Sequence, residues 1–216
     1  MNNSNENNKD LNEKFVKSTR SWTSLSDMKN FINQGVDVNY INSKGETALT
    51  EVLSNEKAII FLEEFFSNNV DVNIGGVFPP LILAVYYYGG FRSNLLQGEM
   101  KKGDTAKMVE WQDIIKFLIT NGGDANYVCP LIPVTPMSNF VLLNEIELLN
   151  LAIENGASLK DIDNNNENLI TLAFNAGNLK MIKFLLFVGA PTTNGVNRIK
   201  FTKYIFSNPK LKNKIY

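Results

Sequence analysis

The sequence contains no histidine and a single cysteine, Cys129, among its 216 residues. The absence of histidine excludes His-dependent triads, His general bases and zinc sites built on imidazole. One thiol cannot form a disulfide within the chain, which favours folding in a reducing compartment. Cys129 has no histidine to act as its base, so we expect a buried or finger-tip thiol rather than a nucleophile.

Long apolar runs are also absent, since no window approaches 18 uninterrupted apolar residues. The first ten residues, MNNSNENNKD, have neither the basic start nor the apolar core of a secretory signal. We therefore expect a cytoplasmic protein that does not enter a membrane. Glycine pairs at 75–76, 89–90 and 122–123 lack the third Gly or the Lys-Ser/Thr of a nucleotide-binding loop. The sequence thus predicts no catalytic residues, no cofactor and no metal.

Acidic residues are missing from residues 168–216, which carry eight Lys or Arg. That segment has a charge of +8, which leaves −9 for residues 1–167 out of the total of −1. The basic segment does not present its aromatic residues as a stacking platform, so nucleic-acid binding is the weaker interpretation. Residues 121–167 are acidic, and carboxylates spaced along a helix and a turn are most simply a solvated face.

What the chain does contain is a repeated pattern. Residues 177–193, GNLKMIKFLLFVGAPTT, combine an apolar stripe at helical spacing with a Gly that would end the helix in a left-handed conformation. Five copies occur, with Gly35, Asn69, Gly122, Gly156 and Gly189 at the stop position. The copies end at residues 39, 73, 126, 160 and 193, and are therefore 34, 53, 34 and 33 residues apart. One period of about 33 residues recurs, and one copy carries about 20 extra residues.

Four of the copies follow the segments GETALTEV, FPPLILAV, VTPMSNF and ENLITLAF. These segments, the period and the G-A-D-x-N-like tails resemble the ankyrin repeat family over residues 24–206, with its T-P-L-H-x-A motif. Thr135 and Pro136 keep the family's Thr-Pro pair, whereas the other copies depart from it. The resemblance implies an all-α solenoid of about five stacked helix-turn-helix units with finger-like turns and a C-terminal capping helix.

The resemblance also implies boundaries. We expect a disordered tail at 1–9 and a single ankyrin-repeat domain at 10–216. Its N-terminal cap, 10–41, would begin with Asp10 and Glu13 as a capping box and would bury Phe15 and Val16. The predicted repeats are about 42–74, 75–127, 128–161 and 162–194, and the C-terminal cap is 195–216. The extra residues form an insertion at 89–107, between the two helices of their repeat.

The insertion has two interpretations, a tolerated surface loop or a functional element. Three tyrosines, Tyr86, Tyr87 and Tyr88, directly precede it. A helix cannot direct three consecutive side chains into its core, so we expect at least one of them to be exposed or covered by the insertion, for example by Leu95 and Leu96. An exposed tyrosine is a common anchor in protein interfaces.

The function implied by the resemblance is non-enzymatic binding of a folded protein through the concave surface of fingers and inner helices. We expect a monomer whose protein partner the sequence does not name. The candidate partner-binding residues are Tyr40, Asn42, Lys44, Phe78, Tyr86, Tyr87, Tyr88, Phe91, Tyr127, Leu131, Ile132, Asp161 and Asp163.

Three alternatives remain open at this stage. The chain would be an inhibitor or immunity protein for a toxic enzyme if its acidic region, with Glu145 and Glu147, covers a basic active site. It would be an enzyme if the insertion supplies catalytic groups such as Glu99, Lys101 or Asp104. It would be a nucleic-acid binder if the basic C-terminal segment contacts phosphates.

Overall fold

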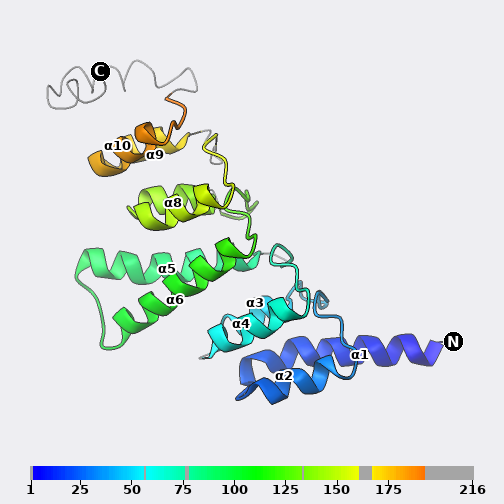
Figure 1. Cartoon of the computed structure of the whole chain (residues 1–216). Helices are drawn as coiled ribbons and strands as arrows, with labels where there is room; N and C mark the ends of the chain where they lie inside the picture. Colours follow the sequence, from blue (N-terminus) through cyan, green and yellow to red (C-terminus); the bar gives the residue numbers. More distant parts are fainter. Residues whose placement is uncertain (1, 56, 76–77, 133, 161–166, 193–216) are drawn as a thin grey trace, which may run out of the picture. The chain divides into compact units, whose positions relative to one another are not determined.

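The computed structural model of the chain describes residues 2–55, 57–75, 78–132, 134–160 and 167–192. Within these residues the regular elements are helices, and the only β-pairing is an isolated bridge between Ile41 and Thr47 (Figure 1). The predicted all-α class is therefore confirmed for this part of the chain. The chain divides into two compact units, Met1–Asp124 and Ala125–Tyr216, and each is described by itself. The single domain at 10–216 stays a prediction.

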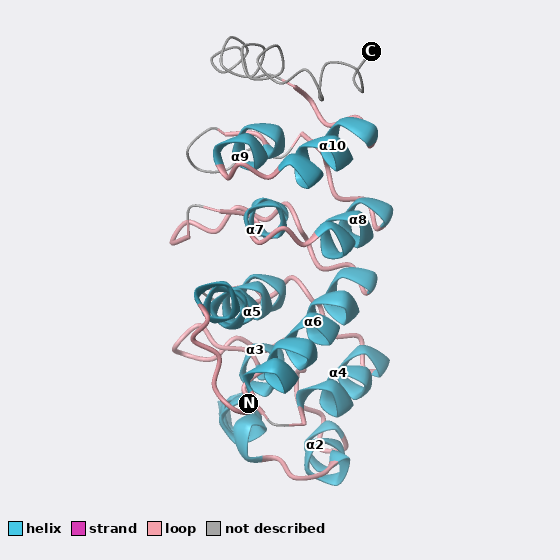
Figure 2. Ribbon diagram, turned by 90° about the vertical axis from the view of Figure 1, so that its left-hand side faces the viewer, coloured by secondary structure: helices cyan, strands magenta, loops and turns pink. Residues whose placement is uncertain are grey.

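The first unit contains two helical hairpins after an N-terminal helical segment. Helices α3 and α4 lie side by side, as do α5 and α6 (Figure 2). The elements are α1 (Asn2–Ser18), the 3-10 turn η1 (Thr19–Ser21), α2 (Leu25–Ile32), α3 (Ala48–Val52), α4 (Ala58–Ser67), α5 (Pro80–Gln97) and α6 (Asp104–Thr120). An aromatic cluster fills its N-terminal core, where the ring of Trp22 lies 5.4 Å from both Phe15 and Phe61.

The second unit contains two shorter hairpins. Helix α7 (Pro136–Leu142) pairs with α8 (Ile146–Glu154), and α9 (Leu169–Asn175) pairs with α10 (Leu179–Phe187). Their facing apolar side chains are fully buried, among them Phe140, Leu149 and Ile182. Cys129 is also fully buried, which confirms the expectation of a buried thiol.

The first helix of three hairpins begins with the same cap. The side-chain oxygens of Thr47, Thr135 and Asn168 each accept a hydrogen bond from the backbone N–H three residues later, at 3.1, 3.0 and 2.8 Å. Asn168 stands where the other two copies have Thr and keeps the bond, because its amide oxygen is an equally good acceptor. The fourth hairpin starts differently, with Pro80 in the first turn of α5, where a missing N–H costs nothing.

The five predicted helix stops are all confirmed. Each stop residue has a positive φ angle, at which the chain leaves the helix in the left-handed region. Asparagine tolerates this region better than other residues with a Cβ, which explains why Asn69 stands where the other copies have glycine. The angles are 81° at Gly35, 58° at Asn69, 90° at Gly122, 93° at Gly156 and 82° at Gly189.

The N-terminus differs from the prediction. Helix α1 begins at Asn2, so residues 2–9 are helical rather than a disordered tail. Once the turn that buries Phe15 and Val16 has formed, each further residue adds a helical hydrogen bond, so the polar residues before it join the helix. Asp10 lies inside α1, and the predicted capping box with Glu13 was therefore wrong. The predicted burial of Phe15 and Val16 is confirmed.

The insertion also differs from a surface loop. Residues 89–97 extend α5 and residues 104–107 begin α6, so only residues 98–103 connect the two helices. Helix α5 has 18 residues, whereas α3, α7 and α9 have 5, 7 and 7. Helix α6 has 17 residues, against 9 or 10 for α4, α8 and α10. The joined ends of α5 and α6 therefore extend beyond α3 and α4 (Figure 1).

Candidate functional site

The turns between the hairpins are tied together by asparagine side chains. The Asn39 amide oxygen accepts a hydrogen bond from the Asp71 N–H at 2.7 Å, and its amide nitrogen donates to the Asn69 carbonyl at 3.2 Å. We call such a two-bond bridge an asparagine rung. A second rung in the first unit joins Asn73 to the Asp124 N–H at 2.8 Å and the Gly122 carbonyl at 3.0 Å.

A third rung lies in the second unit. The Asn126 amide oxygen accepts from the Ser158 N–H at 2.6 Å, and its nitrogen donates to the Ser158 carbonyl at 3.0 Å. In all three rungs the asparagine is the last residue of its copy of the repeated pattern. The rungs fix the spacing of successive turns within each unit, so these asparagines serve the scaffold.

The turn at residues 40–44 holds three of the candidate contact residues, Tyr40, Asn42 and Lys44. Tyr40 is half-buried, and its hydroxyl donates to Glu13 at 3.2 Å. Burial, followed by the Glu13 carboxylate, raises the pKa of Tyr40. Asn42 is only 5% exposed, and its amide oxygen accepts from the N–H groups of Lys44 and Glu46. Asn42 therefore holds the turn and is withdrawn as a contact residue, whereas Lys44 is exposed.

The three tyrosines have three different environments. Tyr88 is buried at 3% exposure, Tyr87 is 39% exposed and Tyr86 is 66% exposed. The expectation that the run cannot be buried as a whole is confirmed, and Tyr88 is withdrawn as a contact residue. Tyr87 is covered by Trp111 of α6. The two rings are stacked, with their centroids 4.8 Å apart and an angle of 18° between their planes. Leu95 and Leu96 do not bury this run, since Tyr86 stays mainly exposed and they are themselves 40% and 69% exposed.

A groove of about 510 Å³ lies where the α5–α6 extension passes the end of α3. Three aromatic side chains line it, Tyr87 and Phe91 from α5 and Trp111 from α6. Sequence reasoning identified Tyr87 and Phe91 but missed Trp111. The available signal was spacing, since Trp111 precedes the buried Ile114 and Ile115 by three and four residues and so lies on their side of the helix.

The opposite side of the groove is the connection between α3 and α4, at residues 53–55. Asn55 is 7% exposed, and its amide nitrogen donates to the carbonyls of Thr19 and Trp22, both at 3.0 Å. Its oxygen accepts from the Lys57 N–H at 2.9 Å. This side of the groove is therefore held by hydrogen bonds to a distant part of the chain, which favours a preformed site.

The charges around the groove are mostly paired. Arg20 donates to Glu51 at 3.0 Å, and hydrogen bonding to this carboxylate is the main reason that the pKa of Arg20 is raised. Glu110, in the groove lining, also interacts with other groups of the chain. Lys107 lines the groove, is exposed and makes no ion pair with any residue that the structure describes. The groove thus combines an apolar aromatic surface with an available cation.

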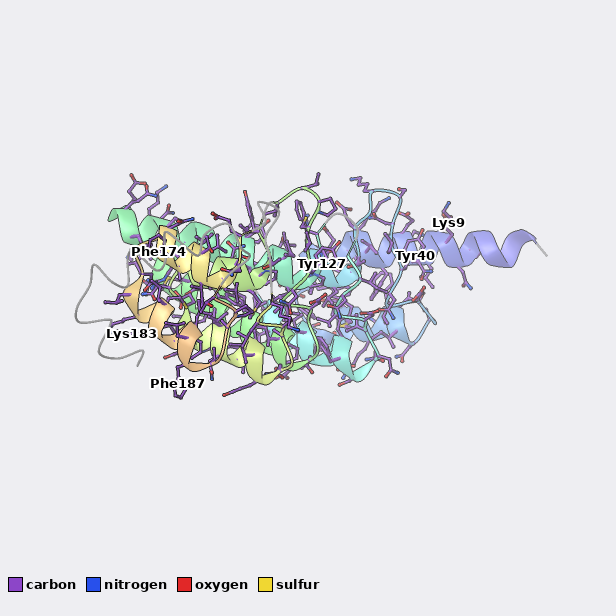
Figure 3. All side chains as sticks on the ribbon, turned by 90° about the horizontal axis from the view of Figure 1, so that it is seen from above. Lys9, Tyr40, Tyr127, Phe174, Lys183 and Phe187 are labelled. Carbon is purple, nitrogen blue, oxygen red and sulfur yellow. The ribbon has the colours of Figure 1, made fainter. Side chains whose placement is uncertain are left out.

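The second unit exposes large apolar side chains in the turn before α7, at Leu142 of α7 and on α10. In the turn that holds three candidate contact residues, Leu131 is 69% exposed, while Tyr127 and Ile132 are half-buried. On α10, Phe187 is 87% exposed and projects from the helix (Figure 3). The corresponding positions of the other four copies hold Asn33, Ser67, Thr120 and Glu154. Sequence reasoning missed Phe187, although this alignment would have identified it.

The remaining predicted residues are scattered. Phe78 is half-buried, and Asp161 and Asp163 lie outside the described residues. Glu145 is 8% exposed, so of the two carboxylates assigned to an immunity role only Glu147 is exposed. The alternative catalytic groups lie at the α5–α6 connection, where Asp104 accepts from the Lys101 N–H at 2.9 Å. The C-terminal cap, 195–216, also lies outside the described residues.

No protein-family model matches the chain, and neither does any curated protein. Over residues 2–55, 57–75, 78–132, 134–160 and 167–192, no helix is long and apolar enough to cross a membrane. The same residues contain no cluster of three or more His, Cys, Asp or Glu side chains that could hold a metal ion.

Proposed function

We propose that the chain is a non-enzymatic protein-binding module built from ankyrin-type repeats. Three recurring features support the repeat assignment, namely the period of about 33 residues, the positive-φ stop of every copy and the asparagine rungs between turns. A rung needs the same side chain at the same place in successive units, which an unrelated set of helical hairpins has no reason to supply. Such repeats bury their cores against neighbours and leave extended surfaces for partners.

The observation that carries the binding proposal is the exposed apolar surface of α5 and α6. Twelve large apolar side chains are exposed among the described residues, and five of them lie on these two helices. They are Tyr86, Tyr87, Leu95, Leu96 and Val109. A concentration of exposed apolar and aromatic side chains on one element is typical of a protein interface.

The lengthened helices also provide area. A stable interface needs roughly 800 Å² from each partner. The α5–α6 extension enlarges the surface of its repeat at the end away from the finger turns, since both helices begin or end near those turns and run outward to residues 98–103. We therefore place the partner surface on the α5–α6 hairpin and its groove, whereas the resemblance implied fingers and inner helices.

The test is photo-crosslinking in the cell that expresses the protein. A photo-reactive phenylalanine analogue replaces Tyr86 in one variant and Ser67, an exposed residue of α4, in a control. The proposal predicts a discrete protein adduct from position 86 that the control does not form. Equal labelling from both positions, or no protein adduct from position 86, would contradict it. Circular dichroism on both variants checks that the helices are retained.

A further inference from the structure

We propose that the groove beside Tyr87 and Trp111 binds a linear segment of the partner protein in which a bulky apolar side chain lies next to a carboxylate. The proposal rests on the proposed function, because it assigns a recognition element to the same surface. It differs in naming a defined site and the chemistry of its occupant.

The apolar part of the site is already assembled. Tyr87 and Trp111 are stacked at 4.8 Å, so each ring holds the other in place, and Phe91 follows Tyr87 by four residues on the same face of α5. Leu53 and Ile114, at 2% and 1% exposure, form the base of the groove. A bulky side chain entering here would contact aromatic carbon on one side and aliphatic carbon beneath.

The size of the groove favours a side chain with its flanking backbone. Its volume of about 510 Å³ lies in the lower half of the range of small-molecule sites, which are usually more enclosed. This groove is open to solvent and not enclosed, so a polypeptide segment can lie in it. Ser54 is exposed at this edge and offers a hydroxyl group to a passing backbone.

The charge of the occupant follows from Lys107. Of the two charged side chains in the lining, Glu110 already interacts within the chain, whereas Lys107 makes no ion pair with a described residue. Lys107 lies four residues before Trp111 on α6, so its ammonium group is presented at the edge of the aromatic surface. A carboxylate beside the apolar anchor would find its charge-assisted hydrogen bond there.

The direct test is peptide selection against the full chain. A phage library of random short peptides is selected on wild-type protein, and the recovered peptides are then measured on three variants. Trp111→Ala removes the stacked ring and Lys107→Glu reverses the available charge. Lys102→Glu is the control, because Lys102 is exposed at the α5–α6 connection and does not line the groove.

We expect the selected peptides to carry Asp or Glu close to an aromatic or large aliphatic residue. They should bind Lys102→Glu as they bind wild type, and bind Trp111→Ala and Lys107→Glu weaker by about tenfold or more. A new selection on Lys107→Glu should favour Lys or Arg in place of the acid.

Three results would overturn the proposal: no selected peptides, peptides without an acidic preference, or unchanged binding to Trp111→Ala. The selected peptides could instead match a segment of this chain's own sequence while light scattering shows a dimer. The groove would then bind a second copy of the chain, which would also overturn the proposal. The proposed function is tested by a separate experiment, because crosslinking from position 86 detects protein binding whether or not the groove binds a linear segment.

Discussion

The side-chain oxygen of Asn39 accepts a hydrogen bond from the backbone N–H of Asp71 at 2.7 Å, across 32 residues of sequence. The nitrogen of the same amide donates to Asn69 in the same turn. One side chain therefore satisfies two backbone groups of the next repeat. The relationship recurs at Asn73 and Asn126, so it belongs to the repeat and not to one turn.

Replacement of Asn39 with alanine should lower the free energy of unfolding by about 1–3 kcal/mol, because two hydrogen bonds are lost at about 0.5–1.5 kcal/mol each. Asn30→Ala is the matched control, since Asn30 is exposed on α2 and alanine is the better helix former. Urea denaturation measures both. If Asn39→Ala destabilised the protein no more than Asn30→Ala, the rung would have no energetic role.

The rungs end within the second unit for a chemical reason. The residue that corresponds to Asn126 in the next copy is Lys160, which has no amide. The residue that corresponds to Ser158 is Pro191, which has no N–H to donate. Neither Lys160 nor Pro191 can therefore supply its hydrogen-bonding group to a further rung.

Two glycines of the first unit should respond oppositely to alanine. Gly122 has a φ of 90°, and a Cβ added there meets nothing within 4 Å, so only backbone strain opposes it. Gly122→Ala should destabilise the protein by about 1–2 kcal/mol. Gly90 lies inside α5 with equal space, and Gly90→Ala should stabilise it by about 0.5–1 kcal/mol. Thermal unfolding of both variants checks the signs, and a stabilising Gly122→Ala would refute the left-handed stop.

The two tryptophans should differ in structural importance. Trp22 is 5% exposed within an aromatic cluster and donates to the Ser18 hydroxyl at 3.0 Å. Trp22→Ala should cost about 3–5 kcal/mol, as expected for a large cavity. Trp111→Ala removes a half-exposed ring and its stack on Tyr87, and should cost only about 1–2 kcal/mol. Denaturant unfolding that gave equal costs would contradict the placement of Trp111 at a surface groove.

Asp27 should make stability depend on pH in the acid range. Its carboxylate accepts from the N–H groups of Thr23 and Ser24 at 2.8 and 2.9 Å, and these bonds lower the pKa of Asp27 below its ordinary value of 3.8. A lowered folded pKa contributes stability above the unfolded pKa, which is lost as the pH falls through the folded pKa. The stability difference between wild type and Asp27→Asn should therefore be present at pH 7 and shrink below about pH 4. A difference that grew toward acid pH would have the wrong sign.

The features that sequence reasoning predicted correctly are local ones. The five helix stops, the buried Phe15 and Val16 and the divided tyrosine run each depend on the spacing of a few residues along one helix. Such spacing fixes which side chains share a face. The asparagine tails were recognised as part of the pattern, but their rungs were not, because a bond across more than thirty residues leaves no local signal.

The features that it predicted wrongly depend on helix length. Polar residues 2–9 suggested disorder, and residues 89–107 suggested a possible loop, yet most of both segments extend helices that neighbouring core residues had already begun. Adding a residue to an existing helix costs little free energy. Composition alone therefore predicts helices that are too short. The groove follows from that length, since it exists only because α5 and α6 pass the end of α3. Its aromatic stack joins residues of two helices, and sequence reasoning therefore found Tyr87 without Trp111.

We propose that the α5–α6 surface binds a protein. Isothermal titration of the purified chain with the protein crosslinked from position 86 would measure this binding. We expect saturable binding by wild type, weakened by about tenfold or more in a Tyr86→Ala, Leu96→Ser double variant that keeps its helical circular dichroism. An unchanged affinity in that folded variant would contradict it.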